Sequence, residues 1–174
     1  DDVESRGLGD VYKRQILDFE RIVAEIAPET SIQMSEIERM GHRQRRNVPI
    51  LVAEDSTLLA SMIREALGKA GYTNVTTFDN GQELWDFLKA HEQDEDIEHL
   101  VALIITDIEM PKMDGHHLTK LVKTHKRFNK IPLIIFSSLI SDEMRIKGKE
   151  VGADRQLTKP EIGNLVSVMD SLLA

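Results

Sequence analysis

The side chains best suited to chemistry lie directly after short apolar segments of the chain. Three carboxylates, a hydroxyl and an ammonium occupy such positions: Glu54, Asp55, Asp107, Ser137 and Lys159. Three carboxylates held close together repel one another unless a cation compensates them. Carboxylate oxygens are ligands that Mg²⁺ prefers, while an ammonium and a hydroxyl can stabilise phosphoryl oxygens. The set therefore predicts phosphoryl transfer assisted by a divalent cation.

The acidic residues have different predicted roles. Asp107 is the predicted nucleophile, because a carboxylate can accept a phosphoryl group as an acyl phosphate. Asp55 and Asp107 are the predicted direct ligands of Mg²⁺, whereas Glu54 is expected to act through a bound water molecule. The backbone carbonyl of Glu109, in the loop after Asp107, is the predicted further ligand.

Taken singly, each of these residues has an ordinary explanation. Acidic pairs such as Glu54 and Asp55 are common at helix N-termini, where they favour the helix dipole. An isolated Lys159 would normally be solvated. Ser56 or Thr57 can cap the following helix instead, which leaves the two acids free for a metal. The functional interpretation therefore depends on these residues meeting in space.

A parallel sheet would bring them together. From Val48 onward, short aliphatic runs alternate with amphipathic stretches, which is typical of βαβ units. The expected strands are 48–53, 72–78, 100–106, 131–136 and 155–158. The expected helices are 57–70, one carrying Leu84 to Leu88, 118–125, 144–151 and 162–173. Ligands of such folds bind at the carboxyl ends of the strands.

The composition narrows the classes of partner. The 174 residues carry a formal net charge of −8 and a pI near 5.3, which disfavours nucleic acid and anionic membranes as main partners. The apolar runs are too short to insert into a membrane. Cysteine is absent, which fits a reducing compartment, and we expect a cytoplasmic protein.

The loop from Asp107 to Gly115 has the pattern Asp-x-x-Met-Pro-x-Met-Asp-Gly. Together with the acidic pair, Ser137 and Lys159-Pro160, it resembles the receiver domain of response regulators. This resemblance implies a flavodoxin-like (βα)5 fold with strand order 2-1-3-4-5. It also implies phosphorylation of Asp107 by a histidine kinase, no enzymatic activity beyond self-catalysed phosphorylation and dephosphorylation, and a cis peptide bond before Pro160.

A narrower likeness extends to chemotaxis proteins. Segments 107–116, 136–140 and 156–165 are similar to the receiver of CheV-type coupling proteins, in which a CheW-like domain precedes the receiver. This resemblance implies a role at the chemotaxis receptor-kinase complex.

The predicted domain organisation follows from the same comparison. Because residues 16–26 resemble the tail of a CheW-like domain, 16–47 is interpreted as that tail and a linker, and 48–174 as the receiver. Residues 1–15 show no sustained periodicity and are interpreted as a non-native segment without an assigned function.

Two features of the sequence leave questions open. Gln156 lies three positions before the lysine, where many receivers carry an aromatic switch residue, so a different switching route is expected.

The alternative function is a magnesium-dependent phosphatase of the haloacid dehalogenase kind, with Asp107 as nucleophile. In that class a second acid lies two residues later, where this chain has Glu109.

Overall fold

Five parallel strands form the centre of the protein in the computed structural model, which describes residues 45–174. They are β1 Ile50–Ala53, β2 Val75–Phe78, β3 Leu103–Thr106, β4 Leu133–Ser137 and β5 Arg155–Thr158. Their order in the sheet is β2-β1-β3-β4-β5, with every neighbouring pair parallel. The predicted flavodoxin-like fold is confirmed. The predicted segment 1–15, and most of 16–47, lie outside the described residues.

Five α-helices connect and follow the strands. They are α3 Thr57–Lys69, α4 Gly81–Ala90, α5 Gly115–Thr124, α6 Asp142–Glu150 and α7 Ile162–Leu173. The first four begin after a capping residue whose side chain accepts a backbone N–H three positions later; these residues are Ser56, Asn80, Asp114 and Ser141. Such caps satisfy a donor that would otherwise lack a partner. Capping by Ser56 leaves Glu54 and Asp55 available for other contacts.

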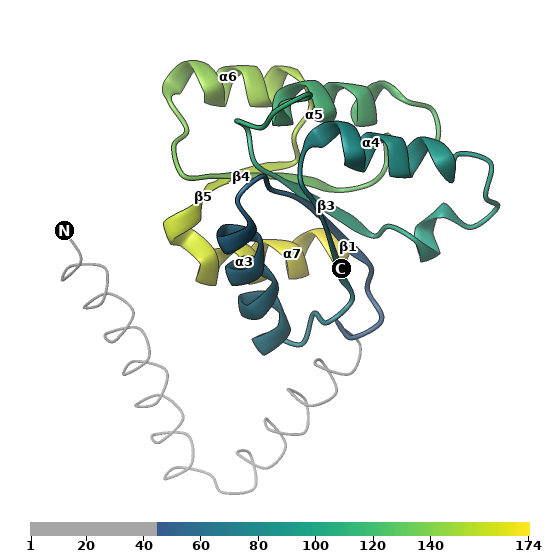
Figure 1. Cartoon of the computed structure of the whole chain (residues 1–174), viewed down its shortest axis with the longest axis horizontal. Helices are drawn as coiled ribbons and strands as arrows, with labels where there is room; N and C mark the ends of the chain where they lie inside the picture. The colour runs from purple at the N-terminus through teal and green to yellow at the C-terminus, as the bar shows by residue number, and fades with distance from the viewer. Residues whose placement is uncertain (1–44) are drawn as a thin grey trace, which may run out of the picture. The chain divides into compact units, whose positions relative to one another are not determined.

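The helices cover the sheet on both faces (Figure 1). Helices α4 and α5 pack on one face through residues such as Leu84 and Leu118, and α3 and α7 on the other through residues such as Leu67 and Leu165. Alternate residues of each central strand point to opposite faces. Because both faces are covered, β1, β3 and β4 are buried along their whole length.

The observed elements differ from the predicted ones mainly at their first residues. The second and third strands begin at Val75 and Leu103 instead of 72 and 100, although Tyr72 is buried in the core. Apolar residues can fill a core without pairing in a sheet. A prediction from hydrophobicity alone therefore made both strands too long. Helices α5 and α6 begin earlier than predicted because Asp114 and Ser141 cap them.

Residues Lys159–Glu161 form a 3-10 turn directly after β5. The predicted cis peptide bond before Pro160 stays a prediction. Glu161 Oε2 accepts hydrogen bonds of 2.8 Å from both the backbone N–H and the hydroxyl of Thr158. These contacts fix the turn on which Lys159 lies.

A polar cluster lies at the base of the domain, away from the carboxyl ends of the strands. Arg45 donates to the backbone oxygen of Ala70 over 2.9 Å and to Asp170 over 2.5 Å. The hydroxyl of buried Tyr72 donates to the same Asp170 carboxylate over 2.5 Å. The cluster therefore ties the start of the described chain to α7. Within residues 45–174, no helix is both long and apolar enough to cross a bilayer.

We expect Gly115→Ala to destabilise the protein by about 2–3 kcal/mol. A Cβ at this position would lie 1.9 Å from the backbone oxygen of Asp107, so the loop between them would have to move. Urea unfolding measures the effect. Gly68→Ala is the control, because its Cβ would meet nothing within 4 Å and alanine stabilises a helix by about 0.5–1 kcal/mol relative to glycine. Equal stabilities would contradict the prediction.

Candidate functional site

The strand register places the predicted site residues at one edge of the sheet. Ala53 at the end of β1 pairs with Thr106 at the end of β3, so Glu54 and Asp107 follow paired residues. Ser137 at the end of β4 pairs with Thr158, the residue before Lys159. Carboxyl ends of parallel strands form the usual ligand site of such sheets.

Three carboxylates meet at this edge. Each of Glu54, Asp55 and Asp107 offers an oxygen that lies within 4.8 Å of the others. Glu54 and Asp107 are only 3% and 8% exposed, whereas Asp55 is exposed to solvent. The predicted acidic cluster is therefore present, and its hard oxygen donors suit a divalent cation such as Mg²⁺.

Lys159 joins the two buried carboxylates. Its Nζ donates to Glu54 Oε2 over 2.6 Å and to Asp107 Oδ2 over 3.2 Å. The lysine side chain is only 11% exposed, so these contacts are shielded from the solvent screening that weakens surface ion pairs. One ammonium thus partly compensates two negative charges that are close together.

Backbone amides hold the other oxygen of each buried carboxylate. The N–H of Ile108 donates to Asp107 Oδ1 over 2.8 Å, and that of Ser56 donates to Glu54 Oε1 over 3.1 Å. Both side chains are therefore fixed from two sides. In Asp107, each oxygen has one contact, which leaves further lone pairs for a metal or a phosphoryl group.

Burial raises the pKa of Glu54 above its ordinary value of 4.5, and the negative charge of Asp107 raises it further. Hydrogen bonds from Lys159 and from the Ser56 backbone oppose this shift. Because the folded pKa is the higher one, the stabilising contribution of Glu54 is full below the unfolded pKa and is lost as pH rises through the folded pKa. A cation bound here would relieve that loss.

Ser137 and Glu109 occupy different positions around the acids. Ser137 is 5% exposed at the end of β4, beside the strand that leads to Lys159. Glu109 is exposed in the loop after Asp107, and its carboxylate does not belong to the group of three formed by described residues. Its predicted contribution was a backbone carbonyl, and that role remains a prediction.

The loop from Asp107 to Gly115 is held by its own backbone. The N–H of Gly115 donates to the oxygen of Ile108 over 2.8 Å, and Lys112 adopts a left-handed φ of 65°. Buried Met113 accepts a 3.2 Å hydrogen bond from Gly81 of α4 through its backbone oxygen. Asp114 Oδ1 accepts the backbone N–H of His117 over 2.8 Å, so the loop ends in the cap of α5.

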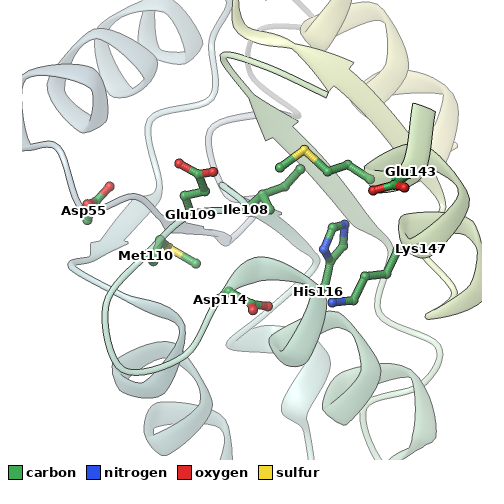
Figure 2. A pocket seen from close by; sticks show the side chains of 9 residues that line it. Asp55, Ile108, Glu109, Met110, Asp114, His116, Glu143 and Lys147 are labelled. Atoms are coloured by element: carbon green, nitrogen blue, oxygen red, sulfur yellow. The ribbon is translucent and has the colours of Figure 1, made fainter. Parts of the chain in front are cut away.

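A cavity of about 640 Å³ opens beside this loop (Figure 2). Its lining joins Asp55 and residues of the loop to the beginnings of α5 and α6; the residues are Asp55, Ile108, Glu109, Met110, Asp114, His116, Glu143, Met144 and Lys147. The acid group and the cavity share Asp55. The acid group therefore borders the cavity at Asp55.

Two polar contacts near the site were not predicted from the sequence. The hydroxyl of fully buried Thr106 donates to the backbone oxygen of Asp107 over 2.8 Å. Gln156 Nε2 donates to the backbone oxygen of Arg145 on α6 over 2.9 Å, while its Oε1 is buried without a hydrogen-bond partner. A polar residue inside an otherwise apolar run was the available signal for Thr106. The partner of Gln156 depends on how α6 packs.

An α/β sheet of this order, with acids at the ends of β1 and β3 and a lysine after β5, defines a receiver of the flavodoxin-like class. Residues 50–170 match the response regulator receiver domain family. The chain belongs to this family.

Similar proteins include chemotaxis proteins of Helicobacter pylori. Chemotaxis protein CheV2 is 31% identical over 162 residues, which cover 92% of this chain but only 50% of CheV2. Chemotaxis protein CheY1 is 30% identical over 111 residues, or 64% of this chain and 84% of CheY1. This chain thus spans half the length of CheV2, and its receiver is similar to those of CheV and CheY proteins.

Solved structures agree with this assignment. The receiver domain of a signal transduction histidine kinase from Syntrophus aciditrophicus is 32% identical, with a TM-score of 0.62, and the match covers 72% of this chain and 89% of that one. Vibrio cholerae chemotaxis protein CheY4 is 28% identical, with a TM-score of 0.59, over 72% of this chain and 98% of that one. Both support the receiver fold.

We expect Lys159→Met to raise the pKa of Glu54 further, because the substitution removes the cation that opposes the effect of burial. A carboxyl ¹³C NMR titration of Glu54 measures the shift. Lys69→Met is the control, since Lys69 pairs with Glu65 at an exposed helix surface and should leave Glu54 unchanged. A Glu54 pKa that does not move in Lys159→Met would contradict this prediction.

Proposed function

We propose that this protein is a phosphoacceptor module of two-component signalling in which Asp107 receives a phosphoryl group from a histidine kinase. The supporting observation is the double contact of Lys159 Nζ with Glu54 and Asp107 at the carboxyl edge of the sheet. This contact holds a cation beside the nucleophile, where negative charge gathers during phosphoryl transfer.

In the proposed reaction, an Asp107 carboxylate oxygen forms a bond to phosphorus while the bond from phosphorus to the kinase histidine nitrogen breaks. The electron pair of the broken bond returns to the imidazole. The ammonium of Lys159 and the hydroxyl of Ser137 contact the phosphoryl oxygens. The Ile108 N–H, which donates to Asp107 Oδ1, keeps the carboxylate oriented.

Glu54, Asp55 and Asp107 would hold Mg²⁺, together with the backbone carbonyl of Glu109. The close approach of three carboxylate oxygens fits this role, because Mg²⁺ requires oxygen ligands and neutralises such a cluster. When bound, the ion would offset the negative charge of the incoming phosphoryl group. Direct ligation by Asp55 and Asp107, with Glu54 acting through water, is the proposed arrangement.

Phosphorylation would be transmitted to α6 through Ser137 and Gln156. Gln156 replaces the aromatic residue found in many receivers, and its side chain already contacts the α6 backbone at Arg145. It lies tightly against α6, since a Cβ at Gly148 would be 2.2 Å from Gln156 Oε1. A movement of Ser137 or Gln156 would therefore displace α6 through these polar contacts.

We further propose that the phosphorylated receiver regulates a chemotaxis receptor-kinase coupling complex in the cytoplasm. The similarity to CheV2 over 92% of the chain supports this role. The match spans only half of CheV2. The coupling role is therefore proposed for a protein in which the receiver is one part. The kinase would be both the phosphodonor and a component of the regulated complex.

We expect Asp55→Asn to weaken binding of Mg²⁺ or Mn²⁺ by at least about tenfold. The substitution removes one of three carboxylates but keeps the side-chain size. Isothermal titration calorimetry measures the affinity. Asp86→Asn, an exposed substitution on α4, controls for the general loss of negative charge. Equal weakening in both variants would count against a metal site at the strand ends.

We expect the wild-type protein, given Mg²⁺ and a small phosphodonor, to gain one phosphoryl group, and Asp107→Asn to gain none. Intact-protein mass spectrometry gives the stoichiometry, and Asp86→Asn should label like wild type. Labelling of Asp107→Asn to the same extent would overturn the acceptor assignment. Repeated turnover of phosphoesters by the wild-type protein would instead support the magnesium-dependent phosphatase.

A further inference from the structure

The cavity beside the acceptor loop has a strongly acidic lining. Four carboxylates, those of Asp55, Glu109, Asp114 and Glu143, face one ammonium, that of Lys147. Figure 2 shows the acids on both sides of the opening, with Asp55 and Glu109 across from Glu143. The lining therefore carries a net negative charge, which favours a positively charged ligand over an anionic one.

His116 provides a second observation at the same cavity. Its side chain is 4% exposed, and its Nε2 is buried without a hydrogen-bond partner. Figure 2 shows the ring rising from α5 toward the cavity, between Ile108 and Lys147. A buried nitrogen without a partner costs about 1–3 kcal/mol. A polar ligand group entering at this wall would supply the missing hydrogen bond.

The environment keeps His116 from adding positive charge to the cavity. Burial lowers the pKa of the imidazole, and the nearby ammonium of Lys147 lowers it further, while Asp114 and a hydrogen bond between the ring and the Met144 backbone oppose this shift. A neutral imidazole has one nitrogen lone pair that can accept an N–H. The remaining wall is apolar, formed by Ile108, Met110 and Met144. Methionine side chains adapt well to varied ligand shapes.

We propose that this cavity binds the basic side chain of a partner protein, an arginine in a peptide segment. The guanidinium would lie between the carboxylates of Asp114 and Glu143, and one of its N–H groups would satisfy His116. Its methylene stem would pack against Met110 and Met144. A cavity of about 640 Å³ has room for such a side chain and part of its backbone.

The occupant would also respond to the state of the acceptor site, a consequence that rests on the proposed function. Asp55 belongs both to the acid group and to the cavity lining. A divalent cation at the acid group would neutralise Asp55 and weaken binding of the arginine. A phosphoryl group on Asp107 would return negative charge to the same edge and strengthen it. A partner could thus distinguish the two states.

The experiment uses the full chain with methyl-labelled methionine and ¹⁵N-labelled histidine. A short peptide with one arginine between alanines is titrated by NMR, and the matched peptide carries citrulline, which is neutral and nearly the same shape. We expect saturable shifts of the Met110 and Met144 methyls and of His116 Nε2 with the arginine peptide alone. Equal shifts with both peptides would overturn the proposal.

Two substitutions test the carboxylates. Glu143→Gln and Asp114→Asn should each weaken the arginine peptide about threefold, and asparagine keeps the helix cap that Asp114 supplies. Asp142→Asn lies in the same first turn of α6 but outside the cavity lining, so it should bind like wild type. Equal weakening by Asp142→Asn would show a general charge effect and overturn the site.

The titration is repeated with Mg²⁺ and with Mg²⁺ plus beryllium fluoride, while labelling of Asp107 is measured separately. Peptide binding that falls with Mg²⁺ and recovers with beryllium fluoride supports the link to phosphorylation. Binding that ignores both additions, in a protein that still labels, overturns the link and leaves the acceptor assignment intact. Binding of the peptide to a protein that never labels would support the cavity alone and reject the acceptor.

Discussion

The structure depends on a lysine ammonium placed between two buried carboxylates. Glu54 and Asp107 follow neighbouring strands, and Lys159, which contacts them over 2.6 and 3.2 Å, offsets the repulsion between these two buried carboxylates. Three strands must therefore keep their relative register within one residue, because a one-residue shift would turn each side chain to the opposite face. The covering of both faces of the sheet by helices fixes that register.

Local features of the sequence determine how the acceptor loop approaches the acids. Gly115 lies so close to Asp107 that a side chain would meet its backbone oxygen at 1.9 Å. The cap at Asp114 starts α5 immediately after the loop, and the cap at Ser56 starts α3 immediately after the acidic pair. Short connections of this kind leave the carboxylates little freedom, so the site is organised before any ligand binds.

Much of the fold and the acid group could be predicted because each depends on local patterns. Buried aliphatic runs marked the strands, and Ser56 marked the start of a helix. The starts of β2 and β3 were wrong because Tyr72 and Val101 fill the core without pairing in a strand. Contacts of Lys159 and Gln156 join distant segments, and only tertiary packing decides them.

The polar contact of Gln156 with α6 has an energetic consequence. Its amide nitrogen has a partner on the helix, but its buried oxygen has none. A buried acceptor of this kind raises the free energy of the present arrangement by about 1–3 kcal/mol. Any alternative position of α6 that lets water or a donor reach this oxygen recovers that energy. The present position of α6 is therefore less stable than it would be if both polar atoms of the Gln156 amide had partners. This lowers the free energy that is needed to displace the helix.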